Sequence, residues 1–216
     1  MDCIPLVKRS KRVDFWLIRR LLGTRAGLLS ALLSFRKCKL SADQIERCIY
    51  EGSNLGITLY KPGYAILDFD ENDSLQVFRN EHPEIADHTP VTQTYRGCHI
   101  HLIIKDRSLR TGKLTRDGKI IGDIKTDGYI AVPPSIHPSG QTYTWIPGQS
   151  PLDLPFIEIE SLKDIGLGIA QPERLPLGIS STLRAIFRIS IRDIWWRAVW
   201  RLGIFQESTD QDATEV

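Results

Sequence analysis

Two patterns of hydrophobic and polar positions follow one another along the chain. Between residues 13 and 50, apolar side chains recur every three or four positions, which predicts amphipathic helices. One of these helices is expected to begin at Ser41, because Ser41-Ala-Asp-Gln44 has the spacing of a capping box. Further on, short apolar runs are bounded by turn residues, as in β-strands. We predict strands over residues 57–60, 64–69, 97–104, 122–125, 129–132 and 143–146.

Helical spacing returns in two further places. Residues 72–88 are expected to form a helix between the second and third strands, and residues 180–205 a C-terminal helix. Residues 206–216 are polar and acidic, a composition typical of disorder. The pattern predicts an α/β fold of the α+β kind, with helices flanking a sheet. We divide the chain into a basic helical element (1–48), a core (49–150), a linker with a C-terminal helix packed on the core (151–205) and an acidic tail (206–216).

Charge is unevenly distributed along the chain. There are 28 Lys and Arg against 26 Asp and Glu, but residues 1–48 hold eleven of the basic and only four of the acidic residues. A one-sided basic segment is the electrostatic footprint of a polyanion such as nucleic acid, although a solvated surface gives the same pattern. The candidate nucleic-acid contacts here are Lys8, Arg9, Lys11 and Arg12.

The predicted C-terminal helix has two interpretations. Its arginines repeat every four residues, and a cluster of tryptophans follows them. The helix either grips a template strand through charge and stacking, or docks an apolar stripe on the sheet and leaves its arginines in solvent. The arginines concerned are Arg184, Arg188 and Arg192.

Several classes of protein are disfavoured. The four cysteines form no CxxC pair, which argues against a zinc ribbon and a disulfide framework and favours a reducing compartment, the cytoplasm. The longest uncharged run near the N-terminus, residues 26–35, has ten residues against the roughly 20 that span a bilayer. We therefore expect no secretion signal, no transmembrane helix and no membrane partner.

Two carboxylates stand at the end of a predicted strand. Strand alternation places Asp68 and Asp70 on one face and sends Leu67 and Phe69 to the other. Two like charges this close repel each other unless a divalent cation or a water-filled surface compensates. Oxygen-rich pairs suit Mg²⁺ or Mn²⁺, while a solvated strand end shows the same spacing.

Two histidines share a face of the next long strand. In the run that ends at Ile104, both His99 and His101 are expected to point to the open face of the sheet. A His-x-His pair without a third ligand is usually only a polar strand face. A histidine can also hydrogen-bond triphosphate oxygens and stabilise charge that develops during phosphoryl transfer.

A third carboxylate follows. Asp123 and Lys125 alternate onto one strand face, before a turn at Asp127-Gly128 and a short strand that Pro133 and Pro134 end. On its own this segment is a hairpin with a proline-rich exit loop. Together with the earlier strands, it supplies the carboxylates for two metal ions and the cations for a triphosphate.

The order of these motifs resembles the primase-polymerase domain of the archaeo-eukaryotic primase superfamily, which occurs in replication proteins of plasmids, phages and other mobile elements. The resemblance covers about residues 50–148. It is carried by Asn54-Leu-Gly-Ile57, Leu67-Asp-Phe-Asp70, Thr94-Tyr-Arg-Gly-Cys-His99, and Gly122-Asp-Ile-Lys-Thr-Asp-Gly-Tyr129 running into Pro133-Pro-Ser-Ile-His-Pro-Ser-Gly140.

The resemblance implies an RRM-like catalytic sheet and roles for individual residues. Two Mg²⁺ or Mn²⁺ ions would be held by Asp68, Asp70 and Asp123. The Gly-x-His spacing selects His99 over His101 as the contact to the phosphates of the incoming nucleotide. The remaining nucleotide contacts would be Lys125, Arg96, Ser135 and His137. The chain departs from the family in having Lys125 where arginine is frequent, a single Gly128, and an inserted or replaced helical element over residues 9–40.

Three functions remain as hypotheses. The favoured one is synthesis or extension of primers on single-stranded DNA from NTPs or dNTPs, by a stand-alone primase or a subunit that works with a separate helicase. The second is a non-catalytic module on the same fold that binds single-stranded nucleic acid or initiates replication. A glycosyltransferase that uses the Asp-x-Asp pair is disfavoured by the third acidic motif and by His99.

Overall fold

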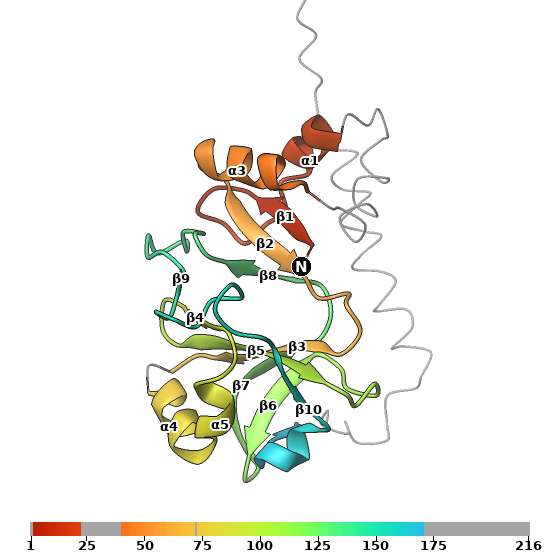
Figure 1. The fold of residues 1–216 in the computed structure, drawn as a ribbon, viewed down its shortest axis with the longest axis vertical. Coiled ribbons are helices and arrows are strands. Elements are labelled where there is room, and N and C mark those ends of the chain that lie inside the picture. The colour runs from red at the N-terminus through yellow and green to blue at the C-terminus, as the bar shows by residue number, and fades with distance from the viewer. Residues whose placement is uncertain (1, 23–39, 72, 171–216) are drawn as a thin grey trace, which may run out of the picture. The chain divides into compact units, whose positions relative to one another are not determined.

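Antiparallel strand pairing organises the chain into two sheets (Figure 1). The structure, a computed structural model, describes residues 2–22, 40–71 and 73–170. The smaller sheet consists of β1 (Cys3–Leu6), β2 (Asn54–Thr58) and β8 (Tyr129–Val132), with β2 between the other two. The strands of the larger sheet are β3 (Tyr64–Phe69), β4 (Val91–Gln93), β5 (Cys98–Ile104), β6 (Gly112–Arg116), β7 (Lys119–Lys125), β9 (Thr144–Trp145), β10 (Ile157–Ile159) and β11 (Gly168–Ile169).

The order of strands in the larger sheet places β3 at its centre. The order is β11-β6-β7-β3-β5-β4-β9, and β10 adds to β5 as a parallel neighbour. Both neighbours of β3 are antiparallel to it. Residues of β3 that face the same way therefore lie side by side with residues of β5 and β7.

Helices cover the outer faces of the two sheets. As Figure 1 shows, α1 (Phe15–Leu22) and α3 (Ala42–Tyr50) lie on the smaller sheet, and α4 (Ser74–Glu81) and α5 (Pro83–Ala86) lie on the larger one. A 3₁₀ helix, Leu162–Ile165, joins the second group. The predicted capping box is present at the start of α3. The Ser41 hydroxyl accepts a hydrogen bond from the Gln44 backbone N–H, and the Gln44 side chain accepts one from the Ser41 N–H.

The two faces of β3 belong to different hydrophobic cores. Leu67 and Phe69 pack with Phe78 of α4 in the core beneath the larger sheet. Tyr64 and Ile66 belong to a second core, which also contains residues of the smaller sheet and of α1 and α3. Alternation along β3 therefore directs Asp68 to the side of the larger sheet that faces the smaller one.

The α+β fold class predicted from the sequence is confirmed. The predicted strands correspond to β2, β3, β5, β7, β8 and β9, and the predicted helix over residues 72–88 to α4 and α5. The strands β1, β4, β6, β10 and β11 were not predicted; four of them have two to four residues, too few to show a period. Within the described residues no helix is long and apolar enough to cross a bilayer. The predicted C-terminal helix with Arg184, Arg188 and Arg192, and the acidic tail, lie outside the described residues.

His101 is a core residue and does not lie on an open face, contrary to the sequence-based expectation. The smaller sheet and residues such as Trp145 cover this part of β5, and His101 is 0% exposed. The Tyr64 hydroxyl lies 2.7 Å from His101 Nδ1, and the Thr92 hydroxyl lies 3.1 Å from Nε2. Burial lowers the pKa of His101 well below its usual value, because the charged imidazolium would lose its hydration.

This burial makes the stability of the fold depend on pH. A histidine resists protonation in the folded chain but takes up a proton below about pH 6.5 when the chain unfolds, so stability should fall as the pH drops through that value. One such group contributes a slope of up to about 1.4 kcal/mol per pH unit. We expect His101→Gln to remove this slope in urea denaturation between pH 7.5 and 5.5. The exposed His88, changed to Gln, serves as the control, and an unaltered slope in His101→Gln would contradict the assignment.

Candidate active site

Strand register aligns four polar residues in one row across the larger sheet. Asp68 of β3 lies opposite Asp123 of β7 on one side and opposite His99 of β5 on the other. Lys113 of β6 lies opposite Asp123 and extends the row. Facing residues of antiparallel strands have Cβ atoms roughly 4.5–5.5 Å apart and point to the same face. Side chains that are distant in sequence thus meet, and Lys113 is a member that sequence reasoning missed.

Two glycines permit this close arrangement around the end of β3. A Cβ atom at Gly122 would stand 2.4 Å from the carbonyl oxygen of Asp68, and one at Gly97 would stand 2.0 Å from that of Phe69. Both distances are too short for any side chain, because the obstructing atoms belong to the backbone of β3. Glycine at these positions lets β7 and the turn before β5 lie directly against the carboxylate-bearing strand.

Lysines hold both oxygens of Asp123. Lys113 Nζ lies 2.9 Å from Oδ1, and Lys125 Nζ lies 3.1 Å from Oδ2. Partial burial raises the pKa of Asp123, but the hydrogen bonds from Lys113 and Lys125 outweigh this effect and leave it below its usual value. The same contact raises the pKa of Lys113. Asp123 therefore remains ionised at neutral pH, and its charge is balanced by two ammonium groups.

His99 lies beside Asp68 and is almost completely buried. Its Nε2 is 3.3 Å from Asp68 Oδ1, and only 3% of the residue is exposed. Its other ring nitrogen, Nδ1, is buried and has no hydrogen-bond partner among the described residues. An unsatisfied buried nitrogen costs stability, and native proteins tolerate few of them. Such a group needs an explanation, and a catalytic or binding task is one.

A small pocket of about 140 Å³ opens above the carboxylates. Its walls come from β3, from the turn before β5, from the turn after β1 and from the loop after β8. The pocket brings together residues that were selected from separate motifs of the sequence: two acids, two cations and two imidazole rings. These residues are Asp68, Asp70, His99, Arg96, His137 and Lys11.

Ser135 does not take part in this pocket, contrary to what the resemblance implied. Its side chain is buried, and its hydroxyl accepts a hydrogen bond from the Leu55 N–H and donates one to the Leu55 carbonyl, both at 2.8 Å. The hydroxyl thereby fastens the loop after β8 to β2. Ser135 thus serves the fold and is not a phosphate contact in this structure. Lys125 also lies outside the described pocket lining, with its ammonium group on Asp123.

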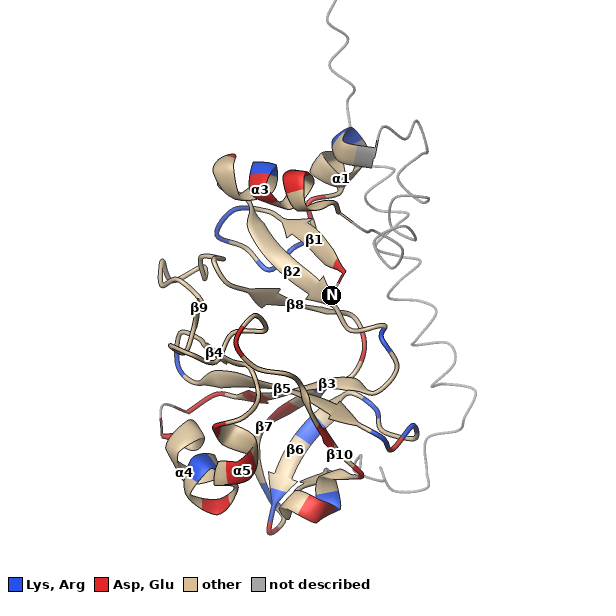
Figure 2. Ribbon diagram, in the orientation of Figure 1, with Lys and Arg blue, Asp and Glu red and all other residues tan. Residues whose placement is uncertain are grey.

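Asn54 brings the basic N-terminal turn to the site. Its amide nitrogen donates to the Ser10 carbonyl at 3.0 Å and to the Ile136 carbonyl at 2.7 Å, and its amide oxygen accepts from the Ile136 N–H at 2.8 Å. The turn over residues 7–12 is thus tied to the loop that carries His137. Figure 2 shows basic residues gathered in this turn beside β1 and β2. Its basic side chains Lys8, Arg9, Lys11 and Arg12 are all exposed.

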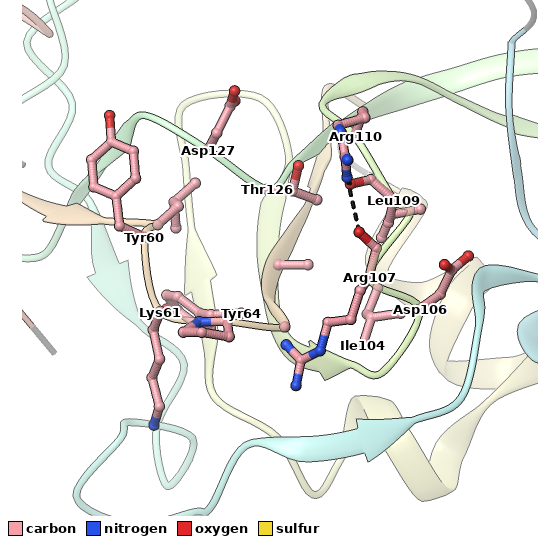
Figure 3. A pocket seen from close by; sticks show the side chains of 14 residues that line it. Tyr60, Lys61, Tyr64, Ile104, Asp106, Arg107, Leu109, Arg110, Thr126 and Asp127 are labelled. Atoms are coloured by element: carbon pink, nitrogen blue, oxygen red, sulfur yellow. Dashed lines mark hydrogen bonds between the residues drawn. The ribbon is translucent and has the colours of Figure 1, made fainter.

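A larger hollow of about 360 Å³ lies at the opposite end of β3 (Figure 3). Lys61, Arg107 and Arg110 border it, and Arg110 donates a hydrogen bond to the Arg107 carbonyl. Among the described residues that line this hollow, none was predicted from the sequence to be a site residue. The smaller pocket is the candidate active site, because Asp68, Asp70 and His99 line it.

The donor chemistry of the three aspartates fits a hard divalent cation. Asp68, Asp70 and Asp123 offer carboxylate oxygens, the ligands that Mg²⁺ and Mn²⁺ prefer. In the part of the chain that the structure describes, no three His, Cys, Asp or Glu side chains stand ready to hold a metal ion as a group. An ion that binds Asp123 competes with Lys113 and Lys125 for its oxygens.

The contacts to Asp123 can be tested by titration. We expect Lys113→Met and Lys125→Met each to raise the pKa of Asp123, because each removes a cation that stabilises the ionised carboxylate. Nuclear magnetic resonance of the carboxyl carbons measures this value directly. Lys119→Met, at the exposed start of β7, should leave it unchanged. An unaltered Asp123 titration in both variants would show that the lysines do not hold the carboxylate in solution.

Comparison with known proteins identifies the family. No curated protein matches the chain. The family model described as the N-terminal domain of bifunctional DNA primase/polymerases, Prim-Pol, matches residues 33–157. The matched range contains all four residues of the row across the sheet. It also contains every lining residue of the pocket except Lys11. Since it also covers more than half of the 216 residues, the chain belongs to the Prim-Pol family of primase/polymerase domains.

Proposed function

We propose that the chain is a template-directed nucleotidyltransferase that makes or extends primers on single-stranded DNA from NTPs or dNTPs. Its family supports primase/polymerase activity in general terms. One observation supports nucleotide transfer in particular: acidic and basic side chains from separate segments line a single pocket. They are Asp68, Asp70, His99, Arg96, His137 and Lys11. This is the combination that transfer of a nucleotide from a triphosphate requires.

The cationic side of the pocket is suited to the triphosphate. Arg96 offers a planar guanidinium that can hold two phosphate oxygens at once, and Lys11 offers a mobile point charge. His99 stands beside Asp68, where it can donate a hydrogen bond to the phosphoryl group that is transferred. These groups stabilise negative charge that increases as the leaving group departs.

Two Mg²⁺ or Mn²⁺ ions would be held by Asp68 and Asp70 of the pocket together with Asp123, which lies opposite Asp68 in the sheet. When bound, such ions lower the pKa of an attacking 3′-hydroxyl and stabilise a leaving pyrophosphate. Lys113 and Lys125 balance the charge of Asp123 without the ions. Once released from Asp123, the same ammonium groups can neutralise phosphates.

The remaining partners follow from charge and family. The turn with Lys8, Arg9 and Arg12 adjoins the pocket through Lys11 and is suited to the phosphates of a DNA strand. The replication context that we propose is a plasmid, a phage or another mobile element. A separate helicase would complete the replication machinery.

A second candidate is a module that binds single-stranded nucleic acid without turnover. It is favoured by the lysines on both oxygens of Asp123, which occupy the carboxylate that a second ion would use. Incorporation of labelled nucleotide separates the two candidates. The assay uses single-stranded DNA with and without a primer, all eight nucleotides, and Mg²⁺ or Mn²⁺. A complete lack of incorporation under all these conditions favours the second candidate.

The carboxylates should act as a set. We expect Asp68→Asn, Asp70→Asn and Asp123→Asn each to reduce incorporation to background, and a double variant to lose little more, because such a site fails as a unit. Thermal unfolding should show an intact fold, since asparagine has nearly the size of aspartate, and Asp68→Asn also removes the like-charge pair with Asp123. The exposed Glu46, changed to Gln, is the control. Nearly normal synthesis by Asp123→Asn would remove it from the site.

His99 should contribute less than a carboxylate but more than a surface histidine. We expect His99→Ala to slow nucleotide transfer by about 10² to 10³, the usual effect of losing one preorganised donor. Rapid-quench measurement under saturating nucleotide reports the transfer step. His88→Ala, with an exposed histidine, is the matched control. A loss of less than tenfold would mean that His99 is only a buried structural residue.

A further inference from the structure

Tyr95 is an exposed aromatic residue at the mouth of the candidate active site. It belongs to the turn between β4 and β5, and it lines the same pocket as Asp68 and Asp70. With 46% of its surface exposed, it contrasts with the nearby Tyr143, which is 3% exposed. No role was assigned to Tyr95 from the sequence. Its ring is therefore accessible to a ligand that enters the pocket.

The Tyr95 ring is stacked on a second ring from a distant segment. His137 lies 5.2 Å away, between ring centroids, with only 12° between the planes. His137 is itself fixed, because its Nδ1 lies 2.8 Å from the Ser139 hydroxyl and accepts from the Ser139 N–H at 3.1 Å. The buried Tyr143 ring supports it from another side, at 6.1 Å. The pair is therefore assembled before any ligand arrives.

The turn that carries Tyr95 is also held in place. The Thr94 hydroxyl accepts from the Gly97 N–H at 3.1 Å, and the Thr94 N–H donates to the Gly97 carbonyl at 2.9 Å. Gly97 in turn lies against the backbone of Phe69, where no larger residue fits. Tyr95 is thus anchored to the strand that bears the carboxylates.

Cations surround this aromatic pair. The Arg96 guanidinium carbon lies 5.9 Å from the centre of the Tyr95 ring, and Lys11 lines the same pocket. Burial, Lys11 and Arg96 together lower the pKa of His137, so its ring is neutral at neutral pH. A flat, neutral pair of rings beside two cations matches the chemistry of a nucleotide unit, which joins a flat base to charged phosphate.

We propose that the Tyr95–His137 pair is a stacking platform for the base of a nucleotide unit whose phosphates lie against Arg96 and Lys11. This inference rests on the proposed function only in supposing that nucleotides enter the pocket. The base belongs either to the free nucleotide or to the DNA strand. Stacking of one base changes affinity by roughly 5- to 150-fold.

The experiment uses the full chain and offers each probe alone, so that binding is measured without synthesis. Two probes distinguish the source of the base: 2-aminopurine riboside triphosphate with Mg²⁺, and a single-stranded oligonucleotide that contains 2-aminopurine. Stacking on an aromatic ring quenches this fluorophore. We expect quenching of at least one probe with Tyr95 and with Tyr95→Phe. Tyr95→Ala should lose the quenching and bind that probe roughly 5- to 150-fold more weakly.

Two controls separate stacking from a structural role. Tyr50→Ala removes a tyrosine that is 91% exposed on α3 and should change neither probe. An oligonucleotide without bases, or ribose triphosphate without a base, should bind Tyr95 and Tyr95→Ala equally. Equal weakening on the abasic ligand would overturn the proposal, because a misfolded rim loses phosphate contacts as well. Unchanged quenching and affinity of both probes in Tyr95→Ala would also overturn it.

The outcome is independent of the primase/polymerase assignment. If the unsubstituted chain incorporates no nucleotide but Tyr95 quenches the oligonucleotide probe, the proposed catalysis fails and the platform stands. If the chain synthesises DNA while Tyr95→Ala behaves like the unsubstituted protein in both binding assays, the platform fails alone.

Discussion

Electrostatic repulsion between Asp68 and Asp123 is the constraint around which the rest of the site is arranged. Central strand pairing sets these carboxylates directly opposite each other, a position in which like charges destabilise a sheet. Cations extend the row at the Asp123 end, and His99 extends it at the Asp68 end. The fold therefore holds two carboxylates side by side, and the neighbouring lysines and His99 offset their repulsion. A protein under selection for stability alone would place apolar or opposite-charge pairs in this row.

The local part of this arrangement could be predicted from the sequence. Alternation along one strand suffices to put Asp68 and Asp70 on the same side, and the capping box at Ser41 is a contact within four residues. Both features depend on neighbours in the chain. The family could also be recognised, because the motifs occur in a fixed order, and the match over residues 33–157 confirms it.

The remaining part depends on contacts between distant segments, which periodicity does not encode. Lys113 belongs to the site only because β6 pairs with β7 in one register, and Asn54 does so through carbonyls 44 and 82 residues away. His101 and Ser135 have residue types suited to an active site. The ring nitrogens of His101, however, lie against the hydroxyls of Tyr64 and Thr92 on neighbouring strands, and the hydroxyl of Ser135 bonds to the Leu55 backbone. A motif identifies the residue type, whereas burial and partners decide its task.

The tie that Asn54 makes to Ser10 affects where the folded unit ends. The family match begins at residue 33, but β1 lies well before it and forms one edge of the smaller sheet. A protein shortened to the matched range would leave one edge of β2 unpaired and would remove one of the two carbonyl acceptors of the Asn54 amide. Unpaired edges attract other chains and promote aggregation. The family match and the folded unit therefore have different limits in this protein, because the smaller sheet includes β1 as well as β2 and β8.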